Sequence, residues 1–235
     1  MFQPDRHCQS RGITGRPVFA LLCERIPDVI SPCRAGEHLS LYHIIPCSAH
    51  AFLSRHCLNF LLGLGNDVDE SVVAKQPFAK YAAQYWVDHA KFGGVLLDLQ
   101  DVIERLFYPD SPTFATWVWL YDIDRKVSMP MAQPTQPEAK PLYYAALCGF
   151  RSLMEHLIIT HQVDVNARGG DHGTALNAAL ARGELKIARV LLQNGADVKI
   201  RDSGGISSLY KAVEVLHNDV ADLLSECRSM SDVCM

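Results

Sequence analysis

The feature that most constrains the fold of this chain is a sequence that recurs in its C-terminal third. The segment KPLYYAALCGF, which starts at Lys140, aligns with TALNAALARGE, which starts at Thr174. A third copy, SSLYKAVEVLHNDVADLL, places Leu209 over Leu176, 33 residues earlier. A unit of this length cannot bury an apolar stripe by itself, so neighbouring units must stack against one another.

The pattern of each unit predicts a pair of helices. In the second copy, Leu176 and Ala179 lie on one face of a short helix. Gly183 can end that helix, because glycine adopts a left-handed conformation at low cost. The apolar stripe of a second helix follows at Ile187, Ala188, Leu191 and Leu192. Asn194, Gly195 and Asp197 then supply turn residues.

These residues resemble the ankyrin repeat, whose pattern is T-P-L-H-x-A-A, a glycine, and then L-L-x-x-G-A-D-V-N. The second copy carries the pattern at Thr174, Leu176, Ala179, Gly183, Leu191, Leu192, Gly195, Ala196, Asp197 and Val198. Its histidine is replaced by Tyr143, Asn177 and Tyr210 in the three copies. If ankyrin histidines tie adjacent turns together, this array should be less stable than a consensus array.

Upstream of the repeats, helical periodicity predicts four helices rich in aromatic residues. They cover Ser48–Leu62, Phe78–Phe92, Leu97–Phe107 and Ser111–Tyr121. Aromatic side chains at this spacing are typical of a hydrophobic core, and His89 is interpreted as a core histidine with its hydrogen bonds satisfied. A platform for stacking nucleic-acid bases would need a basic surround, which this region lacks.

A segment with four prolines, KVSMPMAQPTQPEAKP, separates these helices from the repeats. Proline at this density prevents a regular helix and favours an extended linker. The predicted fold class is all-α, a helical domain followed by a short ankyrin solenoid of about two to three repeats. The predicted parts are a poorly ordered segment (1–38), an aromatic-rich helical domain (39–125), a proline-rich linker (126–139), ankyrin repeats (140–226) and a tail (227–235).

Composition and charge exclude several classes of partner. The net charge of -4 gives no reason to expect nucleic acid, whose binding proteins usually present a basic face. No apolar run approaches the roughly 18 residues of a membrane span. The apolar patch Val18–Cys23 is ended by Glu24 and Arg25, too soon for a signal peptide. A cytosolic or nuclear location therefore follows by default, and of the two a cytoplasmic location is the prediction adopted.

The eight cysteines could form a disulfide framework or a zinc site, but buried reduced thiols are the preferred interpretation. A disulfide framework suits a small secreted domain, and this chain is longer and shows no export signal. A structural zinc site would show close cysteine pairs, and no C-x-x-C occurs, with Cys47 and Cys57 too far apart in sequence. No metal and no cofactor are expected.

A second resemblance covers roughly Leu39 to Leu224. The stretches HLSLYHIIPCSAHAFLSRHCLNFLL, FAKYAAQYWVDHA and LFYPDSPTFATWVWLYDID resemble the helical region between the nucleotide-binding domain and the ankyrin repeats of fungal NACHT-type (STAND) signalling NTPases. That resemblance implies a switch in which a nucleotide-binding domain controls a sensing array. The sequence contains no G-x-x-x-x-G-K-[ST] loop, so the nucleotide-binding part is missing from it.

The expected function is a protein–protein interaction module rather than an enzyme. The resemblance implies that ankyrin arrays contact partners through the tips of their turns and the concave face of their first helices. The candidate partner-binding residues at such positions are Arg168, Asp171, His172, Arg182, Arg201 and Ser203. Any one of them could equally be a solvated loop residue. The expected partner is another protein, and neither nucleic acid nor a membrane is expected to bind.

Two other functions stay open at this point. A hydrolase would need a nucleophile and a base, but no nucleophile elbow or H-E-x-x-H occurs. Asp122 and Asp124 could form a carboxylate pair, but they look like loop residues after a helix. A non-functional truncated fragment of a NACHT-ankyrin protein is the other alternative, because two full copies and a partial third are near the minimum for a stable solenoid.

Overall fold

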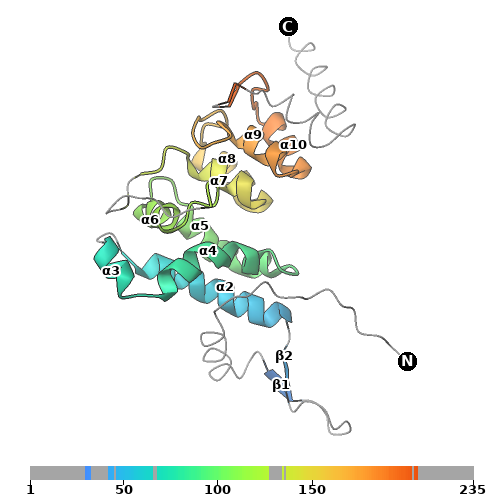
Figure 1. The fold of residues 1–235 in the computed structure, drawn as a ribbon. Coiled ribbons are helices and arrows are strands. Elements are labelled where there is room, and N and C mark those ends of the chain that lie inside the picture. The colour runs from blue at the N-terminus through green and yellow to red at the C-terminus, as the bar shows by residue number, and fades with distance from the viewer. Residues whose placement is uncertain are drawn as a thin grey trace.

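Helices stacked in successive layers form an elongated ladder in the computed structural model of this protein (Figure 1). The structure describes residues 30–32, 42–44, 46–65, 68–126, 134, 136–202 and 204–205. The ladder begins with the aromatic-rich helices and continues without a break in packing into the repeats. The predicted tail (227–235) and most of the third copy lie outside the described residues.

The N-terminal part of the ladder is the helical region predicted from periodicity. Its elements are α2 (Pro46–Gly63), α3 (Glu70–Ala74), α4 (Phe78–Ala90), the 3₁₀ helix η2 (Val95–Leu99), α5 (Gln100–Leu106) and α6 (Pro112–Leu120). The four predicted helices are confirmed as α2, α4, η2 with α5, and α6. Helix α3 was not predicted, because its five residues are too few to show a helical period. The Asp69 side chain caps it by accepting the Val72 backbone N–H at 2.8 Å.

The repeats form two complete helix pairs among the described residues. They are α7 (Pro141–Cys148) with α8 (Arg151–His161) and α9 (Ala175–Ala181) with α10 (Leu185–Gln193). Gly149 and Gly183, at equivalent positions, have φ angles of 75° and 73° and allow the chain to turn between the two helices of each pair. A Cβ atom at Gly149 would lie 2.5 Å from the Glu184 carboxylate, which is the end of a flexible side chain, so the positive φ is what favours glycine there.

A short antiparallel strand pair departs from the otherwise helical fold. Strand β1 (Ile30–Pro32) pairs with β2 (Tyr42–Ile44), with Ser31 opposite His43. β1 falls in the segment that was predicted to be poorly ordered, and the rest of that segment lies outside the described residues. Strands of three residues are too short for their alternation to be recognised in a sequence.

One hydrophobic core extends through both the helical region and the repeats. Phe150, which precedes α8, packs its ring 5.6 Å from that of Trp86 in α4. Tyr144 of α7 packs 5.8 Å from Trp117 of α6. The Trp117 indole also donates a hydrogen bond to the Ala83 carbonyl at 3.0 Å. The helical region therefore covers the N-terminal end of the array, which would otherwise expose the apolar face of α7 to water.

Two buried cysteines agree with the expectation of reduced thiols. Cys57 of α2 and Cys148 of α7 are free and buried, and burial raises the pKa of each thiol to about 12. A thiol with such a pKa stays protonated and is a poor nucleophile at neutral pH. Cys47 is free and exposed.

His89 of α4 faces α2, and both of its ring nitrogens are within hydrogen-bond distance of partners, as predicted for a histidine with its hydrogen bonds satisfied. Its Nε2 lies 3.0 Å from the Tyr81 hydroxyl, and its Nδ1 lies 2.8 Å from Nδ1 of His50. Which atom donates in each contact depends on the tautomers of the two rings, and a single proton lies between the two Nδ1 atoms when both rings are neutral, so that one ring donates and the other accepts. Protonating both histidines would direct two N–H groups at each other.

This histidine pair predicts that the protein loses stability as the pH falls. Burial lowers the pKa of both rings, and for His89 the neighbouring His50 lowers it further while Asp88 opposes the shift. The unfolded chain, with an ordinary pKa of 6.5, binds these protons first. The stability that the neutral histidine pair contributes is therefore complete above pH 6.5. It is lost progressively below pH 6.5, as the pH approaches the lowered pKa values of the folded state. Urea unfolding from about pH 8 to about pH 5 should show this decline.

The matched variants are His89→Gln and His56→Gln, the second at an exposed histidine of α2. The loss of stability between about pH 8 and about pH 5 should be smaller in His89→Gln than in the unaltered protein, and it should be unchanged in His56→Gln. Equal pH dependence in the two variants would contradict the assignment.

Candidate partner-binding interface

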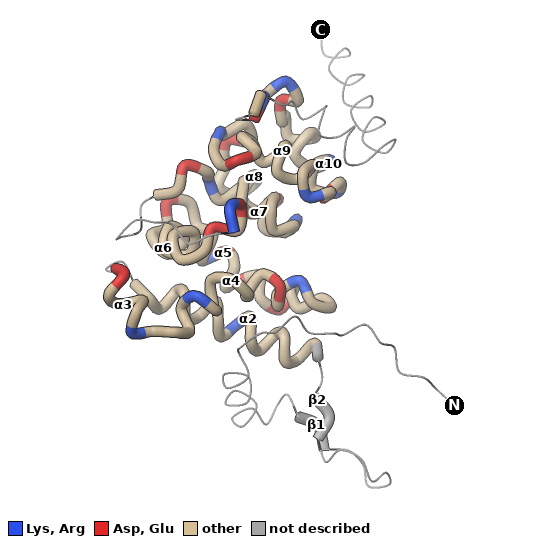
Figure 2. Tube along the Cα trace, viewed as in Figure 1, with Lys and Arg blue, Asp and Glu red and all other residues tan. Residues whose placement is uncertain are grey.

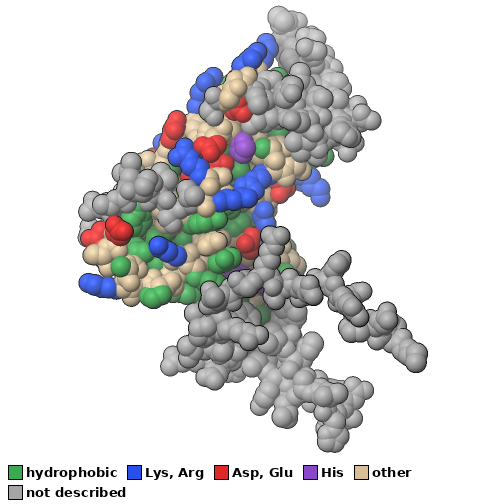
Figure 3. Space-filling view, in the orientation of Figure 1, with side chains coloured by type: hydrophobic (Ala, Val, Ile, Leu, Met, Phe, Trp, Pro, Cys, Tyr) green, Lys and Arg blue, Asp and Glu red, His purple; other side chains and the backbone are tan. Residues whose placement is uncertain are grey.

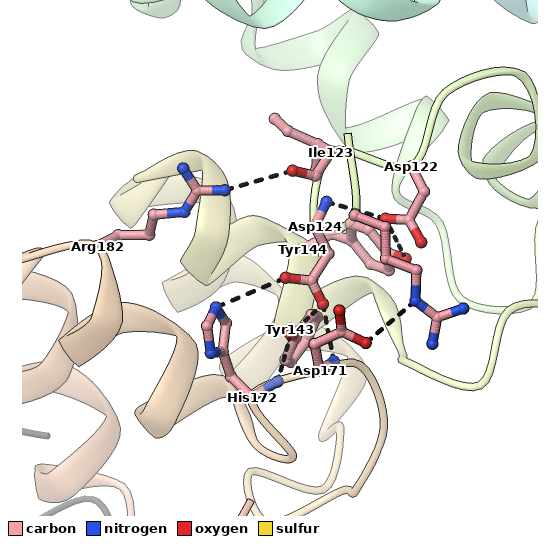
Figure 4. Close-up of polar contacts among 9 residues, drawn as sticks. Asp122, Ile123, Asp124, Tyr143, Tyr144, Asp171, His172 and Arg182 are labelled. Carbon is pink, nitrogen blue, oxygen red and sulfur yellow. Dashed lines mark hydrogen bonds and ion pairs between the residues drawn. The ribbon is translucent and has the colours of Figure 1, made fainter. Parts of the chain in front are cut away.

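A turn that follows α6 is docked against the tip of the first repeat (Figure 4). We call residues 121–125 the acidic turn, residues 168–173 the first tip and residues 201–205 the second tip. The acidic turn carries two buried carboxylates. Asp122 is 4% exposed, and the side chain of Asp124 is 2% exposed. Buried carboxylates are costly unless hydrogen bonds replace their lost hydration, so their partners define this interface.

The Asp124 carboxylate is the centre of the hydrogen-bond network. Its Oδ2 accepts the Tyr143 hydroxyl at 2.5 Å and the Asp171 backbone N–H at 2.9 Å. Its Oδ1 lies 3.6 Å from Nε2 of His172. The Tyr143 oxygen in turn accepts the His172 backbone N–H at 3.1 Å. The Asp124 side chain, from the helical region, thus joins α7 of the first repeat to the first tip.

Asp122 stabilises the turn from inside. Its Oδ1 accepts the Asp124 backbone N–H at 2.9 Å and the Tyr144 hydroxyl at 3.2 Å. Burial raises the pKa of Asp122, and the neighbouring Asp124 adds to the rise, while these hydrogen bonds oppose it. Burial and the adjacent carboxylates also raise the pKa of Tyr143 and Tyr144, so both phenols remain hydrogen-bond donors.

Two arginines complete the contact at its exposed rim. The Arg125 Nε lies 3.1 Å from Oδ1 of Asp171, and the Arg182 guanidinium donates to the Ile123 carbonyl at 3.3 Å. Both partners of the Arg125 pair are about half exposed, so we assign it at most about 1 kcal/mol. The buried network around Asp124 carries the specificity of this docking.

The predicted partner-binding residues fall into two groups. Asp171, His172 and Arg182 are brought together by the structure, but around the acidic turn of the same chain. Arg168 and Arg201 are exposed at equivalent positions of the first and second tips, and Arg201 donates to the Gly205 carbonyl at 3.0 Å. Ser203 lies outside the described residues.

The interpretation of Asp122 and Asp124 as loop residues at the end of a helix is confirmed, because they lie in the turn after α6. Their burial and their hydrogen bonds to the repeats were not predicted. The signal that could have indicated this is the placement of two acids directly after the apolar run WVWLY. Nothing local in the sequence identifies Tyr143 and the first tip as their partners.

The inner helix of the first repeat is closed to partners. All eight residues of α7 are buried; in α9, Ala175 to Leu180 are buried as well, and the exposed Arg182 follows its last residue. The first tip also closes tightly on Tyr143. Gly170 has a φ of 72°, and a Cβ atom there would lie 2.4 Å from the Tyr143 ring. The concave face that a first repeat could offer is therefore covered by this chain itself.

The residues that replace the ankyrin histidine do connect adjacent turns. Tyr143 is bonded to the His172 backbone, and the buried Asn177 donates through its amide to the Ile200 carbonyl at 3.4 Å. The expected weakening therefore cannot be attributed to missing connections at these two positions. The third position, Tyr210, lies outside the described residues.

Charged groups of both signs gather on the loops beside α7 and α9 (Figure 2), and the space-filling view shows them with a histidine on the visible face (Figure 3).

Within the described part of the chain, no group of three or more His, Cys, Asp or Glu side chains could hold a metal ion. The described helices also include none that is long and apolar enough to cross a membrane.

Comparison with known proteins agrees with this geometry. Residues 137–233 match a family described as ankyrin repeats (3 copies), so the C-terminal part of the chain is an ankyrin-repeat array. Arrays of this fold are in general non-catalytic scaffolds that bind other proteins.

Several relatives share parts of the sequence. Azaphilone pigments biosynthesis cluster protein L of Monascus ruber is 32% identical over 166 residues, which cover 64% of this chain and 35% of that protein. This alignment is longer than the array, so it also includes part of the helical region. Ankyrin repeat and SAM domain-containing protein 6 of Rattus norvegicus is 35% identical over 98 residues, which cover 41% of this chain and 10% of that protein. The chain spans about a third or less of the length of these relatives.

Proposed function

We propose that this chain is a protein-binding scaffold that acts as the sensor arm of a fungal STAND-type protein in the cytoplasm. The observation that carries the proposal is the division of the tips: the first is filled by the acidic turn, and the second presents the exposed Arg201. The likeness to a fungal protein in which this chain corresponds to 35% of the length supports an arm within a longer protein.

The partner-binding surface begins at the exposed arginine of the first tip and continues along the array. Because α7 is buried, a partner meets Arg168, the end of α9 and the second tip instead. Arginine is favoured at such surfaces, since its planar guanidinium makes several directed hydrogen bonds. Arg182 is the boundary of this surface, because it already bonds to the acidic turn.

A co-purification experiment with the full chain tests this surface. In the double variant Arg168→Glu and Arg201→Glu, recovery of a partner from a fungal extract should fall about tenfold or more, because charge reversal opposes docking. The double variant Lys80→Glu and Lys186→Glu, an equal charge change at exposed positions of α4 and α10, should leave recovery unchanged. Circular dichroism checks that each variant is folded.

Unchanged recovery with the folded double variant would overturn the assignment of these arginines. Arg182→Glu is unsuitable for the same comparison, because it would also break the contact with Ile123.

A further inference from the structure

We infer that the junction of α5 and α8 binds a helix of a second partner protein, one that carries a large apolar residue with a lysine or arginine one turn away. The inference goes beyond the proposed function, because this junction lies away from Arg168 and Arg201. Helix α8 begins at Arg151, beside the junction, and ends at His161, before the first tip. At 1.5 Å per residue its two ends are about 16 Å apart, so one scaffold can hold two proteins.

The junction contains a hollow of about 280 Å³, counting the space at its open mouth. Its floor is formed by the apolar side chains of Ile103, Phe150 and Leu153, none of which is more than 4% exposed. Leu97 stands at the rim and is 75% exposed, the most exposed large apolar side chain among the described residues. A partner side chain that covers this floor and packs on Leu97 removes apolar surface of both molecules from water.

The walls of the hollow are held in place by contacts within the chain. The ring of Phe150 lies 5.6 Å from that of Trp86, in the shared core. Gln100, which lines the hollow, donates its amide to Oε1 of Glu104 at 2.9 Å. That same oxygen lies 3.9 Å from Nδ1 of His156, across the junction on α8. A site held in this way needs little ordering when a ligand binds.

The acids of η2 and α5 determine the charge of the ligand. These two helices carry Asp98, Asp101 and Glu104 against one base, Arg105. The Asp101 side chain is 72% exposed, and the Arg55 guanidinium lies 4.0 Å away, at the outer limit of an ion pair. An exposed pair of this length is weak, so Asp101 can bind a basic group of a ligand.

The α8 side of the junction adds no net charge to this balance. Arg151 and Glu155 form an ion pair at 2.8 Å, one turn apart on α8. An acidic ligand is repelled by the acids of η2 and α5 and competes with Glu155 for Arg151, whereas a basic ligand meets complementary charge. Leu97 and Asp101 are four residues apart, so a helix lying along α5 meets both with an apolar and a basic residue one turn apart.

The test begins with a selection from a phage-displayed library of random 12-residue peptides on the full-length protein. Recovered sequences should share a large apolar residue with a lysine or arginine three or four positions away. They are then synthesised with a fluorophore, and binding is followed by fluorescence anisotropy. Leu97→Ser should weaken binding about fivefold or more, and Asp101→Lys about tenfold or more.

Each variant has a matched control. Ile159→Ser removes an apolar side chain of α8 that is 73% exposed and does not line the hollow. Asp88→Lys makes the same charge change as Asp101→Lys at an exposed position of α4. Neither control should change peptide affinity by more than about twofold, and circular dichroism checks that all four variants are folded.

Several results would overturn the inference. The first is recovery of no binding peptide, or of peptides enriched in acidic instead of basic residues. The second is equal weakening by a substitution and its control. The third is a dimer in sedimentation velocity that Leu97→Ser abolishes, which would make a second copy the occupant. The fourth is faster amide exchange within residues 1–29 in Leu97→Ser, which would make the occupant a segment of this chain.

The co-purification experiment gives an independent result, because the double variant Arg168→Glu and Arg201→Glu leaves the junction unaltered. Peptide binding should be unchanged in that variant. If the selection fails while co-purification still depends on the two arginines, the proposed function stands and only the second partner is wrong.

Discussion

Replacing Trp117 by alanine is expected to lower the free energy of unfolding by about 4 kcal/mol and to destabilise the repeats as well as the helical region. The indole is 0% exposed, contacts the rings of Trp86, Phe107, Phe114 and Tyr144, and donates to the Ala83 carbonyl. Its loss leaves a large cavity in the shared core. Urea unfolding followed by circular dichroism measures the change.

The matched control is Tyr108→Ala, where the ring is 58% exposed, and it should cost less than about 1 kcal/mol. A single transition in the unaltered protein, shifted as a whole by Trp117→Ala, is the expected result for a shared core. It would also argue against a non-functional fragment. Two transitions, of which only one responds to the substitution, would show that the helical region and the array unfold separately.

Replacing Asp124 by alanine is expected to lower the free energy of unfolding by about 3 kcal/mol. The substitution removes the acceptor of the Tyr143 hydroxyl and of the Asp171 backbone N–H, and the hydroxyl is then left in a largely buried position. Hydrogen exchange of the first tip should also become faster, because the contact that holds Asp171 is lost. The same urea unfolding experiment, together with amide exchange, checks both effects.

Asp101→Asn provides the comparison, since that carboxylate is 72% exposed and lies 4.0 Å from Arg55. It should change stability by less than about 0.5 kcal/mol. If Asp124→Ala had an equally small effect and exchange at the first tip did not change, the acidic turn would not hold the two regions together.

Local sequence patterns were sufficient for most of the helices. Helix α4 is an example, because Phe78, Tyr81 and Trp86 recur at helical spacing over a segment long enough to show the period. The repeats were recognisable for a similar reason, since Gly149 and Gly183 must be equivalent if each ends the first helix of a pair. Such features depend on residues close together in the chain.

The contact between the two regions could not be predicted in that way. Asp124 lies 19 residues from Tyr143 and 47 from Asp171, and no local period relates them. The predicted candidates Asp171, His172 and Arg182 were selected as tip residues, and the sequence could not show that the chain itself uses them. The same holds for Phe150, whose contact with Trp86 joins the first repeat to α4.

The complete burial of α7 has a consequence for how such proteins can diversify by recombination. A first repeat fitted to Trp117, Asp124 and the rest of the helical region cannot be exchanged for one from another array without also changing those residues. A crossover within the proline-rich segment would therefore join surfaces that do not match. A crossover after α8 would keep that matched pair intact, but it would still require a second repeat that fits α7 and α8, because Ala175 to Leu180 of α9 are buried as well.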